Sequence, residues 1–280
     1  METTVENKER YTLTISIVTF NNRDKIGKAL NSVIAAGALL DSYHIIVVDN
    51  GSSDSTPEFI ATHFPQVTII HSENVGYGAG HNKAMNEIKG LSRYHLVMNP
   101  DVYFPQEVFQ QLIRFMDETP DTGLVMPKIL YPDNSIQYLC KMLPTPFDLI
   151  GRRFLPGFLK PLFRNHSTRY EFKNKNYEEM MNVPHLSGCF MFLRSQVLET
   201  VGGFDPRFFM YLEDVDFSRR IHSLYRTLYY PFVSIYHHYN QGSYKKWRLL
   251  KYHVTSAVKY FNKWGWFFDK ERRIINRSFK

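Results

Sequence analysis

The sequence predicts an α/β fold in which helices cover both faces of a mostly parallel central sheet. In the first half of the chain, short apolar and β-branched runs alternate with stretches of helical period, and strands separated by helices form parallel sheets. Polar residues also follow three of these runs, at the edge where such sheets bind ligands. With 280 residues, 44% of them hydrophobic, the chain can form one large domain or two small ones.

Four strands and four helices are expected before residue 120. The strands are apolar and β-branched runs that end in polar turns, at 12–19, 43–48, 67–71 and 94–98. The helices are expected at 23–36, between the turn at 49–54 and residue 64, at 80–88, and at 106–116, where Pro105 suits the first turn. This alternation is the pattern that predicts the parallel sheet.

The second half begins with a less regular segment. Residues 140–181 are rich in prolines, aromatics and basic side chains and have weak periodicity, so we expect an irregular insertion or lid there. Regular structure then resumes with a strand at 184–194, a glycine turn at 202–203, a helix through 213–224, and short strands at 227–230 and 234–236. Residues 241–280 are expected to form a helical tail.

Three polar residues stand at the carboxyl ends of the predicted strands. Thr19 ends the first strand, Asp49 follows the second, and Asp101 follows the fourth. Because Asp and Asn favour turns, each of these residues alone could be an ordinary turn residue. Three of them at one edge of the sheet favour a binding site instead.

Asp101 is a candidate metal ligand. It lies in the sequence Asn99-Pro100-Asp101, and Mg²⁺ or Mn²⁺ commonly takes one or two carboxylates together with substrate phosphates. A metal there would neutralise a leaving diphosphate. His237 and His238 follow a short predicted strand, and a neutral imidazole at either position could bind the metal or a phosphate.

Three acids occur within four residues at Glu213, Asp214 and Asp216, after an aromatic and aliphatic run. Neighbouring residues of a helix point about 100° apart, so one acid can face a cleft while another takes a structural partner. A carboxylate beside an apolar wall can act as a general base. The alternative is an acidic first turn favoured by the helix dipole, which explains the acids but not the apolar run before them.

A glycine-rich loop at 74–82 precedes a predicted helix. Such a loop lets the backbone approach a nucleotide or phosphate closely. It is not a dinucleotide fingerprint, because His81 stands where the last glycine belongs and the loop follows the third strand rather than the first.

Six motifs occur in order along the chain: TISIVTFNN at 14–22, VVDNGSSD at 47–54, the glycine-rich loop at 74–82, NPDV at 99–102, SGCF at 187–190 and GGFDPRFFMYLEDVD at 202–216. Together they resemble the family 2 inverting glycosyltransferases of GT-A fold, and within that family the rhamnosyltransferase-like enzymes of bacterial polysaccharide assembly. The resemblance covers about residues 13–238.

The resemblance implies a role for each matching residue. It assigns nucleotide binding to Thr19, Asp49, Asn82 and Asn99, Mg²⁺ or Mn²⁺ binding to Asp101 and His237, the donor sugar and acceptor to Gly188 and Glu213, and the catalytic base to Asp214. Asn99 replaces the first acid of the family's D-x-D motif, so the metal site loses one charge. This variant favours a dTDP-deoxysugar such as dTDP-rhamnose over a UDP-sugar.

The resemblance further implies a single displacement that inverts the sugar configuration. The donor would be a dTDP- or UDP-sugar and the acceptor a saccharide or a lipid-linked sugar; the oligomeric state is open, and a homodimer is compatible with the sequence. Residues 1–240 would form the catalytic domain, with a nucleotide-binding half at about 12–130 and an acceptor half at about 182–240. Two alternatives are a non-catalytic nucleotide-sugar-binding subunit of a transferase complex and a nucleotidyltransferase. The latter would need a basic, glycine-rich loop where the chain has TFNN at 19–22.

The tail at 241–280 needs its own explanation, because it carries a local net charge of +9, with eleven Lys and Arg against two acids, while the whole chain carries +7. Apolar residues recur there at helical spacing, at Trp247, Leu250, Val254, Ala257, Phe261 and Trp264. This stripe could lie on an anionic membrane or pack against the catalytic domain. No nucleic-acid motif is present, so nucleic acid is not an expected partner.

The expected location is cytoplasmic, with peripheral attachment to the inner face of the cell membrane if the tail binds lipid. Residues 1–10 are polar and charged, unlike a signal peptide, and no apolar run approaches the roughly 20 residues of a membrane span. The two cysteines, Cys140 and Cys189, are far apart and suit a reducing compartment.

Overall fold

The computed structural model describes residues 10–151, 158, 163–238 and 247–279. Its strands are β1 (Tyr11–Thr19), β2 (Tyr43–Asp49), β3 (Thr68–His71), β4 (Ser92–Met98), β5 (Val102–Tyr103), β6 (Thr122–Leu130), β7 (Met181–Asn182), β8 (Phe190–Arg194) and β9 (Arg226–His237). Its helices are α1 (Ile26–Gly37), α2 (Thr56–His63), α3 (Tyr77–Glu87), α4 (Val108–Glu118), the π-helix η1 (Phe147–Gly151), α6 (Arg164–Tyr170), α7 (Gln196–Thr200), α8 (Glu213–His222), α10 (Trp247–Trp264) and α11 (Lys270–Arg277).

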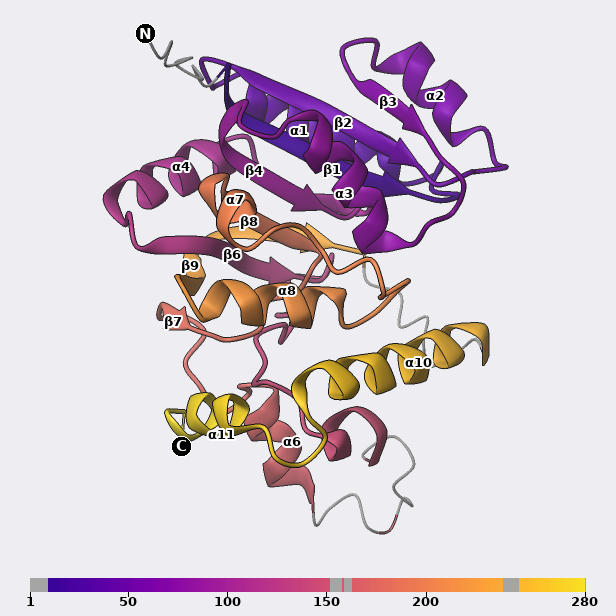
Figure 1. Ribbon diagram of the computed structural model, residues 1–280. Helices are drawn as coiled ribbons and strands as arrows, with labels where there is room; N and C mark the ends of the chain where they lie inside the picture. The colour runs from indigo at the N-terminus through magenta and orange to yellow at the C-terminus, as the bar shows by residue number, and fades with distance from the viewer. Residues whose placement is uncertain (1–9, 152–157, 159–162, 239–246, 280) are drawn as a thin grey trace, which may run out of the picture.

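One mixed sheet runs through the molecule (Figure 1) in the order β3-β2-β1-β4-β8-β6-β9-β5, with β7 beside β9. Strands β1 to β4 are parallel, and β6 and β9 are parallel to each other. The antiparallel β8 joins these two parts, between β4 and β6. The predicted α/β class and mostly parallel sheet are therefore confirmed.

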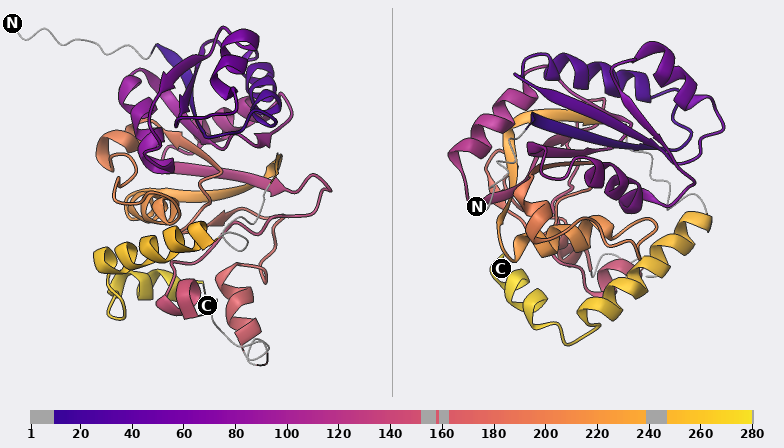
Figure 2. Two further views of the ribbon diagram at one scale, coloured as in Figure 1. Left: turned by 90° about the vertical axis from the view of Figure 1, so that its right-hand side faces the viewer. Right: turned by 45° about the horizontal axis from the view of Figure 1, so that its top comes forward.

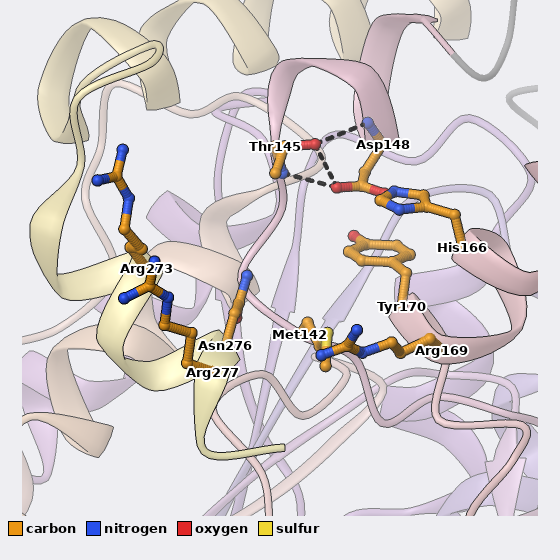
Figure 3. A pocket seen from close by; sticks show the side chains of 9 residues that line it. All are labelled: Met142, Thr145, Asp148, His166, Arg169, Tyr170, Arg273, Asn276 and Arg277. Carbon is orange, nitrogen blue, oxygen red and sulfur yellow. Dashed lines mark hydrogen bonds and ion pairs between the residues drawn. The ribbon is translucent and has the colours of Figure 1, made fainter. Parts of the chain in front are cut away.

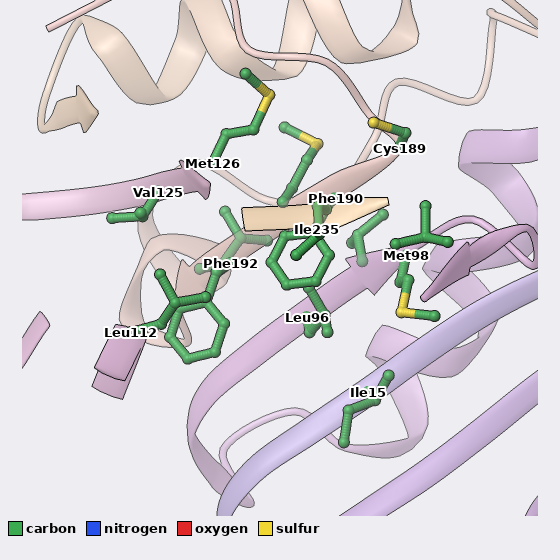
Figure 4. Packing of buried hydrophobic residues seen from close by; sticks show 14 of the residues in the cluster. Ile15, Leu96, Met98, Leu112, Val125, Met126, Cys189, Phe190, Phe192 and Ile235 are labelled. Atoms are coloured by element: carbon green, nitrogen blue, oxygen red, sulfur yellow. The ribbon is translucent and has the colours of Figure 1, made fainter. Parts of the chain in front are cut away.

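Helices cover both faces of the sheet because its strands are apolar on both sides. On one face, α1 and α4 contact each other and bury Leu30 and Leu112 in the main core. On the other face, α3 packs on β1 and β2, and α8 packs on β6 and β9. Figure 4 shows the main core at β8, where Phe190 and Phe192 lie among side chains of β4, β6 and β9.

Two strands differ from the sequence prediction in length. The strand expected at 184–194 begins only at Phe190, because the Gly188 N–H donates to the Asp214 carboxylate rather than to a neighbouring strand. The two short strands expected at 227–230 and 234–236 are one strand, β9. Its pairing with β6 shifts where Pro231, which has no N–H to give, interrupts the ladder.

The segment at 140–181 is only partly irregular. It contains η1 and α6, and α6 forms because Tyr170 at its end is buried against the body of the protein. The prediction of a wholly irregular insertion was wrong for these residues, while 152–157 and 159–162 lie outside the described residues.

The C-terminal tail is helical, as predicted, and packs against the rest of the protein (Figure 2). Ala257, Tyr260 and Phe261 of α10 are fully buried in a cluster with Leu149 of η1 and Val215 of α8. Of the two partners considered for the apolar stripe, protein therefore covers this part of it, although Trp247 at its start is 80% exposed. None of the helices in the described part of the chain is long and apolar enough to cross a bilayer.

Buried polar contacts fix the tail in place. The Arg219 guanidinium of α8, 1% exposed, pairs with Asp269 at 2.7 Å and with Glu271 at 2.6 Å. The buried Asp216 carboxylate accepts from the Trp264 indole at 2.8 Å and pairs with Lys263 at 2.6 Å. Arg219 therefore takes its charge partners from the tail, whereas Asp216 pairs with Arg220 of its own helix as well as with Lys263.

Candidate active site

Thr19 and Asp49 lie side by side at the carboxyl ends of β1 and β2, where the sheet register pairs them directly. One oxygen of the Asp49 carboxylate, Oδ2, accepts from the backbone N–H groups of Gly51 and Ser52, at 3.2 and 3.0 Å. The other, Oδ1, is buried without a hydrogen-bond partner among the described residues. A buried acceptor without a donor is costly, so Oδ1 is suited to receive an N–H from a ligand.

Asn82 lies on α3, and its amide contacts the loop before α8. Its Nδ2 donates to the Phe204 carbonyl at 2.7 Å, and its Oδ1 accepts from the Phe204 N–H at 2.8 Å. These two bonds use one N–H and one oxygen lone pair of the amide and leave a second N–H and a second lone pair. Asn82 thus holds this loop, and its contact with a nucleotide stays a prediction.

Asp101, His237 and Asn99 meet beyond the ends of β4 and β9. The His237 Nε2 lies 3.4 Å from Asp101 Oδ1 and 3.4 Å from Asn99 Nδ2, while its Nδ1 faces the Gln137 Oε1 at 3.1 Å. Lys25 is 3.9 Å from the other Asp101 oxygen. Burial alone would lower the pKa of His237, but Cys189 and the Asp101 carboxylate outweigh it and raise that pKa to about 10.

These residues fit a divalent cation. Gln137 orients the imidazole so that Nε2 faces the Asp101 carboxylate, an arrangement typical of metal-binding histidines. Among the described residues no group of three or more His, Cys, Asp or Glu side chains forms a complete metal cage. Two protein ligands are nevertheless sufficient for Mg²⁺ or Mn²⁺ when substrate phosphates and water supply the rest.

Asp214 lies in the first turn of α8 and lines a cavity of about 360 Å³. Its Oδ2 accepts from the Gly188 N–H at 3.0 Å and lies 3.5 Å from the His185 Nε2. Burial raises the pKa of Asp214, but His185, the Gly188 N–H and Lys141 outweigh that effect and hold the pKa below its usual value. Asp214 is therefore ionised at neutral pH and faces the cavity as a proton acceptor.

The adjacent Glu213 has the opposite electrostatic environment. It is 6% exposed, and its Oε2 has no hydrogen-bond partner among the described residues. Burial, together with the neighbouring Asp214 charge, raises the pKa of Glu213 well above its usual value. The pKa values of the two neighbouring carboxyl groups are therefore shifted in opposite directions.

The backbone just before Asp214 is strained. Tyr211 and Leu212 both have positive φ, at 70° and 68°, which is uncommon for residues with large side chains. The Phe209 carbonyl receives the Tyr77 N–H at 3.0 Å, and a Cβ on Gly76 would lie 2.1 Å from that carbonyl oxygen. The glycine-rich loop thus clamps the chain ahead of α8, and this strain, typical of functional sites, fixes the direction of Asp214.

Gly188 is adjacent to Asp214, where a Cβ would meet the Asp214 Cβ at 3.1 Å. The Gly188 carbonyl accepts from the Tyr77 hydroxyl at 2.6 Å. The same cavity is lined by Asn99, Cys189 and His237, whereas Asp101 lines a second pocket together with Lys28, Tyr103 and His238. His237 links the candidate base to the candidate metal ligand, because it lines the first cavity and its Nε2 lies 3.4 Å from the Asp101 Oδ1. The His238 N–H donates to the Asp101 backbone carbonyl at 3.1 Å, so His238 stays the second candidate histidine.

Sequence reasoning missed three residues around Asp214. These are His185, Lys141 and Tyr77, which come from the segment before β8, the insertion and the glycine-rich loop. None stands in a strand-end or acidic motif, and only the fold brings them together. An isolated β-bridge joins Lys141 to His185, although the two residues are more than forty positions apart in the sequence.

Comparisons with known proteins identify the family of the chain. The family model described as glycosyl transferase family 2 matches residues 14–202. The chain is 28% identical over 206 residues to the N-acetylglucosaminyl-diphospho-decaprenol L-rhamnosyltransferase of Mycobacterium tuberculosis, covering 69% of this chain and 66% of that relative. It is 26% identical to the rhamnosyltransferase WbbL of Escherichia coli, covering 95% of this chain and 96% of the relative.

A likeness to solved structures supports the fold. The mannosyltransferase PcManGT from Pyrobaculum calidifontis, solved with GDP-Man and Mn²⁺, superposes with a TM-score of 0.58 at 17% identity, over 98% of this chain and 75% of that one. At this identity the likeness shows the GT-A fold alone. Because the family model covers well over half of the chain, the protein belongs to glycosyl transferase family 2.

Proposed function

We propose that the protein transfers a sugar from a nucleoside-diphosphate donor to a hydroxyl group of a lipid-linked acceptor and inverts the configuration at the transferred carbon. The observation that carries this proposal is the position of His237, which lines the same cavity as Asp214 and lies 3.4 Å from Asp101. A proton acceptor and a diphosphate-binding cluster beside one another are the two groups that a single displacement requires.

The donor nucleotide would lie at the ends of the parallel strands. The Asp49 Oδ1, buried and without a partner among the described residues, would accept the ring N–H of the base, and Thr19 would lie beside it. Asn99 would lie close to the diphosphate, at the rim of the cavity. Both thymine and uracil carry the ring N–H that this oxygen needs, so the contact fits a dTDP- or a UDP-sugar.

Asp101 and His237 would hold Mg²⁺ or Mn²⁺ against the diphosphate. The cation supplies positive charge that stabilises the negative charge developing on the leaving nucleoside diphosphate. Lys25, 3.9 Å from Asp101, adds a protein charge on the same side. The chain's own role is to orient the imidazole through Gln137 and to place both ligands at the rim of the cavity.

Asp214 would take the proton from the acceptor hydroxyl as that oxygen attacks the anomeric carbon. The bond from that carbon to the diphosphate oxygen breaks on the opposite side, and the configuration inverts. The Gly188 N–H and His185 hold the carboxylate in the orientation this step requires. The raised pKa of Glu213 favours its neutral form beside this carboxylate, and Glu213 would be available to the sugar or acceptor.

The identities of the donor sugar and acceptor are proposed from the relatives. The names of two relatives include rhamnosyltransferase, and the mycobacterial name specifies a diphospho-decaprenol carrying N-acetylglucosamine. We therefore propose L-rhamnose as the transferred sugar, dTDP-rhamnose as the donor and a prenyl-diphosphate-linked sugar as the acceptor, in the synthesis of a cell-surface polysaccharide.

A test of this function supplies both substrates directly. The full chain with Mn²⁺ would be incubated with dTDP-L-rhamnose and farnesyl-diphospho-N-acetylglucosamine, and the product would be followed by mass spectrometry. The expected result is an added rhamnose, with release of dTDP. If product forms with UDP-N-acetylglucosamine and not with dTDP-L-rhamnose, the proposed donor is wrong. Absence of transfer from every nucleotide sugar tried would refute the proposed function.

The protein would meet its acceptor at a membrane surface. Exposed apolar residues lie next to basic ones at the turn between α10 and α11 and along α11: Phe267, Phe268, Lys270, Arg273, Ile274 and Arg277. Apolar side chains beside Lys and Arg are suited to anionic lipid. This patch replaces the α10 stripe as the membrane candidate, because much of that stripe is buried.

Substitution of this patch tests membrane binding better than deletion of the tail, because deletion would also remove the charge partners of Arg219. Phe267→Ser combined with Phe268→Ser should weaken co-sedimentation with phosphatidylglycerol vesicles. Phe232→Ser, at a 62% exposed phenylalanine on β9, is the matched control. Equal sedimentation of both variants and the unchanged protein would contradict the membrane proposal.

A further inference from the structure

A second cavity, of about 320 Å³, lies between the insertion and the last helix. Figure 3 shows α6 on one side of it and α11 on the other. Arg169 comes from α6, while Arg273 and Arg277 come from α11, one helical turn apart. The proposed reaction, as derived so far, uses none of these residues.

The charge of this cavity is strongly positive. In the described part of the chain, none of the three guanidinium groups forms an ion pair or hydrogen bond with a carboxylate. The one acid in the cavity wall, Asp148, is already engaged, since its Oδ2 accepts from the Thr145 N–H at 2.8 Å and its Oδ1 contacts the His166 Nε2 at 2.8 Å. The cavity therefore has three cationic groups and no available anion.

The walls of the cavity are held in place by α11. Asn276 of this helix donates to the Leu143 carbonyl at 2.8 Å and accepts from the Leu143 N–H at 3.0 Å. The Met142 N–H in turn donates to the Tyr170 carbonyl at 3.0 Å. These contacts fix the spacing between the arginines of the two helices.

This cavity adjoins the active-site cavity, and the two share a wall. Tyr170 lines both of them. We call the cavity lined by Arg169, Arg273 and Arg277 the arginine cavity. Neighbouring residues also divide between the two spaces: Lys141 and Leu149 line the active-site cavity, while Met142 and Asp148 line the arginine cavity. A ligand in the arginine cavity would thus be separated from the cavity of Asp214 only by this shared wall.

We infer that the arginine cavity binds the diphosphate group of the acceptor. Arg recognises phosphate oxygens through paired N–H donors, and three arginines outnumber the two negative charges of a diphosphate that joins a sugar to a prenyl chain. A sugar attached to that diphosphate would extend over Tyr170 towards Asp214, while its prenyl chain would leave along the exposed side of α11. This inference rests on the proposed transfer to a lipid-linked acceptor and specifies where that acceptor is held.

The first test measures binding without any reaction. The full chain would be titrated calorimetrically with farnesyl diphosphate in the presence of EDTA, so that a metal-dependent donor site does not compete. Arg169→Gln and the double variant Arg273→Gln/Arg277→Gln should each weaken binding at least tenfold. Arg164→Gln removes the same charge from the same helix α6 outside the cavity and should bind as the unchanged protein does.

Two outcomes would overturn the inference. One is unchanged farnesyl diphosphate affinity in both cavity variants. The other is equal affinity of the cavity for dihexanoyl phosphatidylglycerol, because the site would then recognise any lipid phosphate rather than the acceptor's diphosphate. Arg169→Gln also distinguishes binding of a diphosphate from binding of a lipid headgroup. Because Arg169 lies on α6, outside the α11 membrane patch, this substitution should leave vesicle sedimentation unchanged.

The second test measures transfer. Arg169→Gln should raise KM at least tenfold for a diphosphate-linked acceptor sugar and leave KM for the octyl glycoside of the same sugar unchanged, with kcat preserved for both. An equal rise for both acceptors would contradict a diphosphate contact. If the unchanged protein transfers to neither acceptor, the proposed function fails, but the binding titration still reports on the cavity.

Discussion

The two halves of the sheet place their functional groups in different ways. In the parallel half, Thr19 and Asp49 stand at the ends of adjacent strands, so the local order of strand and turn determines their positions. In the other half, Asp214 depends on Gly188, His185 and a strained turn, and its helix is held by the tail. The comparison teaches that the donor side is built from local motifs, whereas the acceptor side is built from contacts between distant segments.

The largest expected effect is on the acceptor side, at Asp214 itself. Asp214→Asn should lower kcat about a thousandfold, roughly 4 kcal/mol, because the amide cannot take the proton of the acceptor hydroxyl. Nucleotide affinity should be unchanged. Steady-state transfer rates measure the first effect and calorimetry the second.

Asp121→Asn is the control for this substitution, because Asp121 is an exposed acid paired only with Arg226 across 3.5 Å. Its transfer rate should equal that of the unchanged protein. If Asp214→Asn still turns over within tenfold of the unchanged rate, Asp214 is not the base, and the contrast between the two halves loses its main support.

The dependence of the acceptor side on the tail can be tested through stability. Asp269→Asn should lower the free energy of unfolding by about 3 kcal/mol, since it removes a charge from the buried pair with Arg219 while an asparagine can still cap α11. Urea denaturation measures the change. Glu118→Gln removes an exposed pair with Arg114 and should cost no more than about 0.5 kcal/mol.

A loss equal to that of the surface control would show that the tail does not support α8. The tail and residues 1–240 would then unfold as separate units, as the domain boundary expected from the sequence at residue 240 implies.

On the donor side, the expected effect is smaller and local. Asp49→Asn should weaken dTDP binding about tenfold to a hundredfold, because an amide N–H would face the ring N–H of the base where a charged acceptor stood. The change should be the same with and without Mn²⁺. An affinity within twofold of the unchanged protein would place the base elsewhere.

The smallest effect concerns Glu213. Its folded-state pKa is raised above the unfolded value of 4.5, so the folded protein binds more protons than the unfolded chain above that pH. Stability therefore decreases as pH rises from about 4.5 towards the raised pKa, by up to about 1.4 kcal/mol per pH unit. Glu213→Gln, which cannot ionise, should lack this decrease.

Urea denaturation at pH 4, 6 and 7 would check the prediction. The two proteins should be about equally stable at pH 4, and the variant should gain on the unchanged protein at each higher pH. Parallel pH profiles would mean that Glu213 is ionised in the folded protein.

Much of the donor side could be predicted from the sequence. Strands β1, β2 and β4 are apolar runs with polar ends, and a parallel sheet brings those ends to one edge, so the proximity of Thr19 and Asp49 follows from the pattern. The contact of Asn82 with the Phe204 backbone could not be predicted, because Phe204 lies in a loop 122 residues away. A local motif does not reveal such a contact.

The acceptor side could be predicted only in part. The acids at 213–216 indicated a site, but their different environments depend on His185, Lys141 and the tail, which no spacing rule connects. The tail's helical stripe was visible in the sequence, yet periodicity alone does not distinguish lipid from protein as its partner. The arginine cavity escaped prediction because its walls come from α6 and α11, about a hundred residues apart.

The most direct test of the central claim, a donor nucleotide and metal site at the strand ends of Asp49 and Asp101, is calorimetric titration of the full chain with dTDP and with UDP, each with and without Mn²⁺. We expect Mn²⁺ to strengthen binding of both nucleotides, and the tighter one identifies the donor class. If neither nucleotide binds to the folded protein with or without Mn²⁺, the account of this site is contradicted.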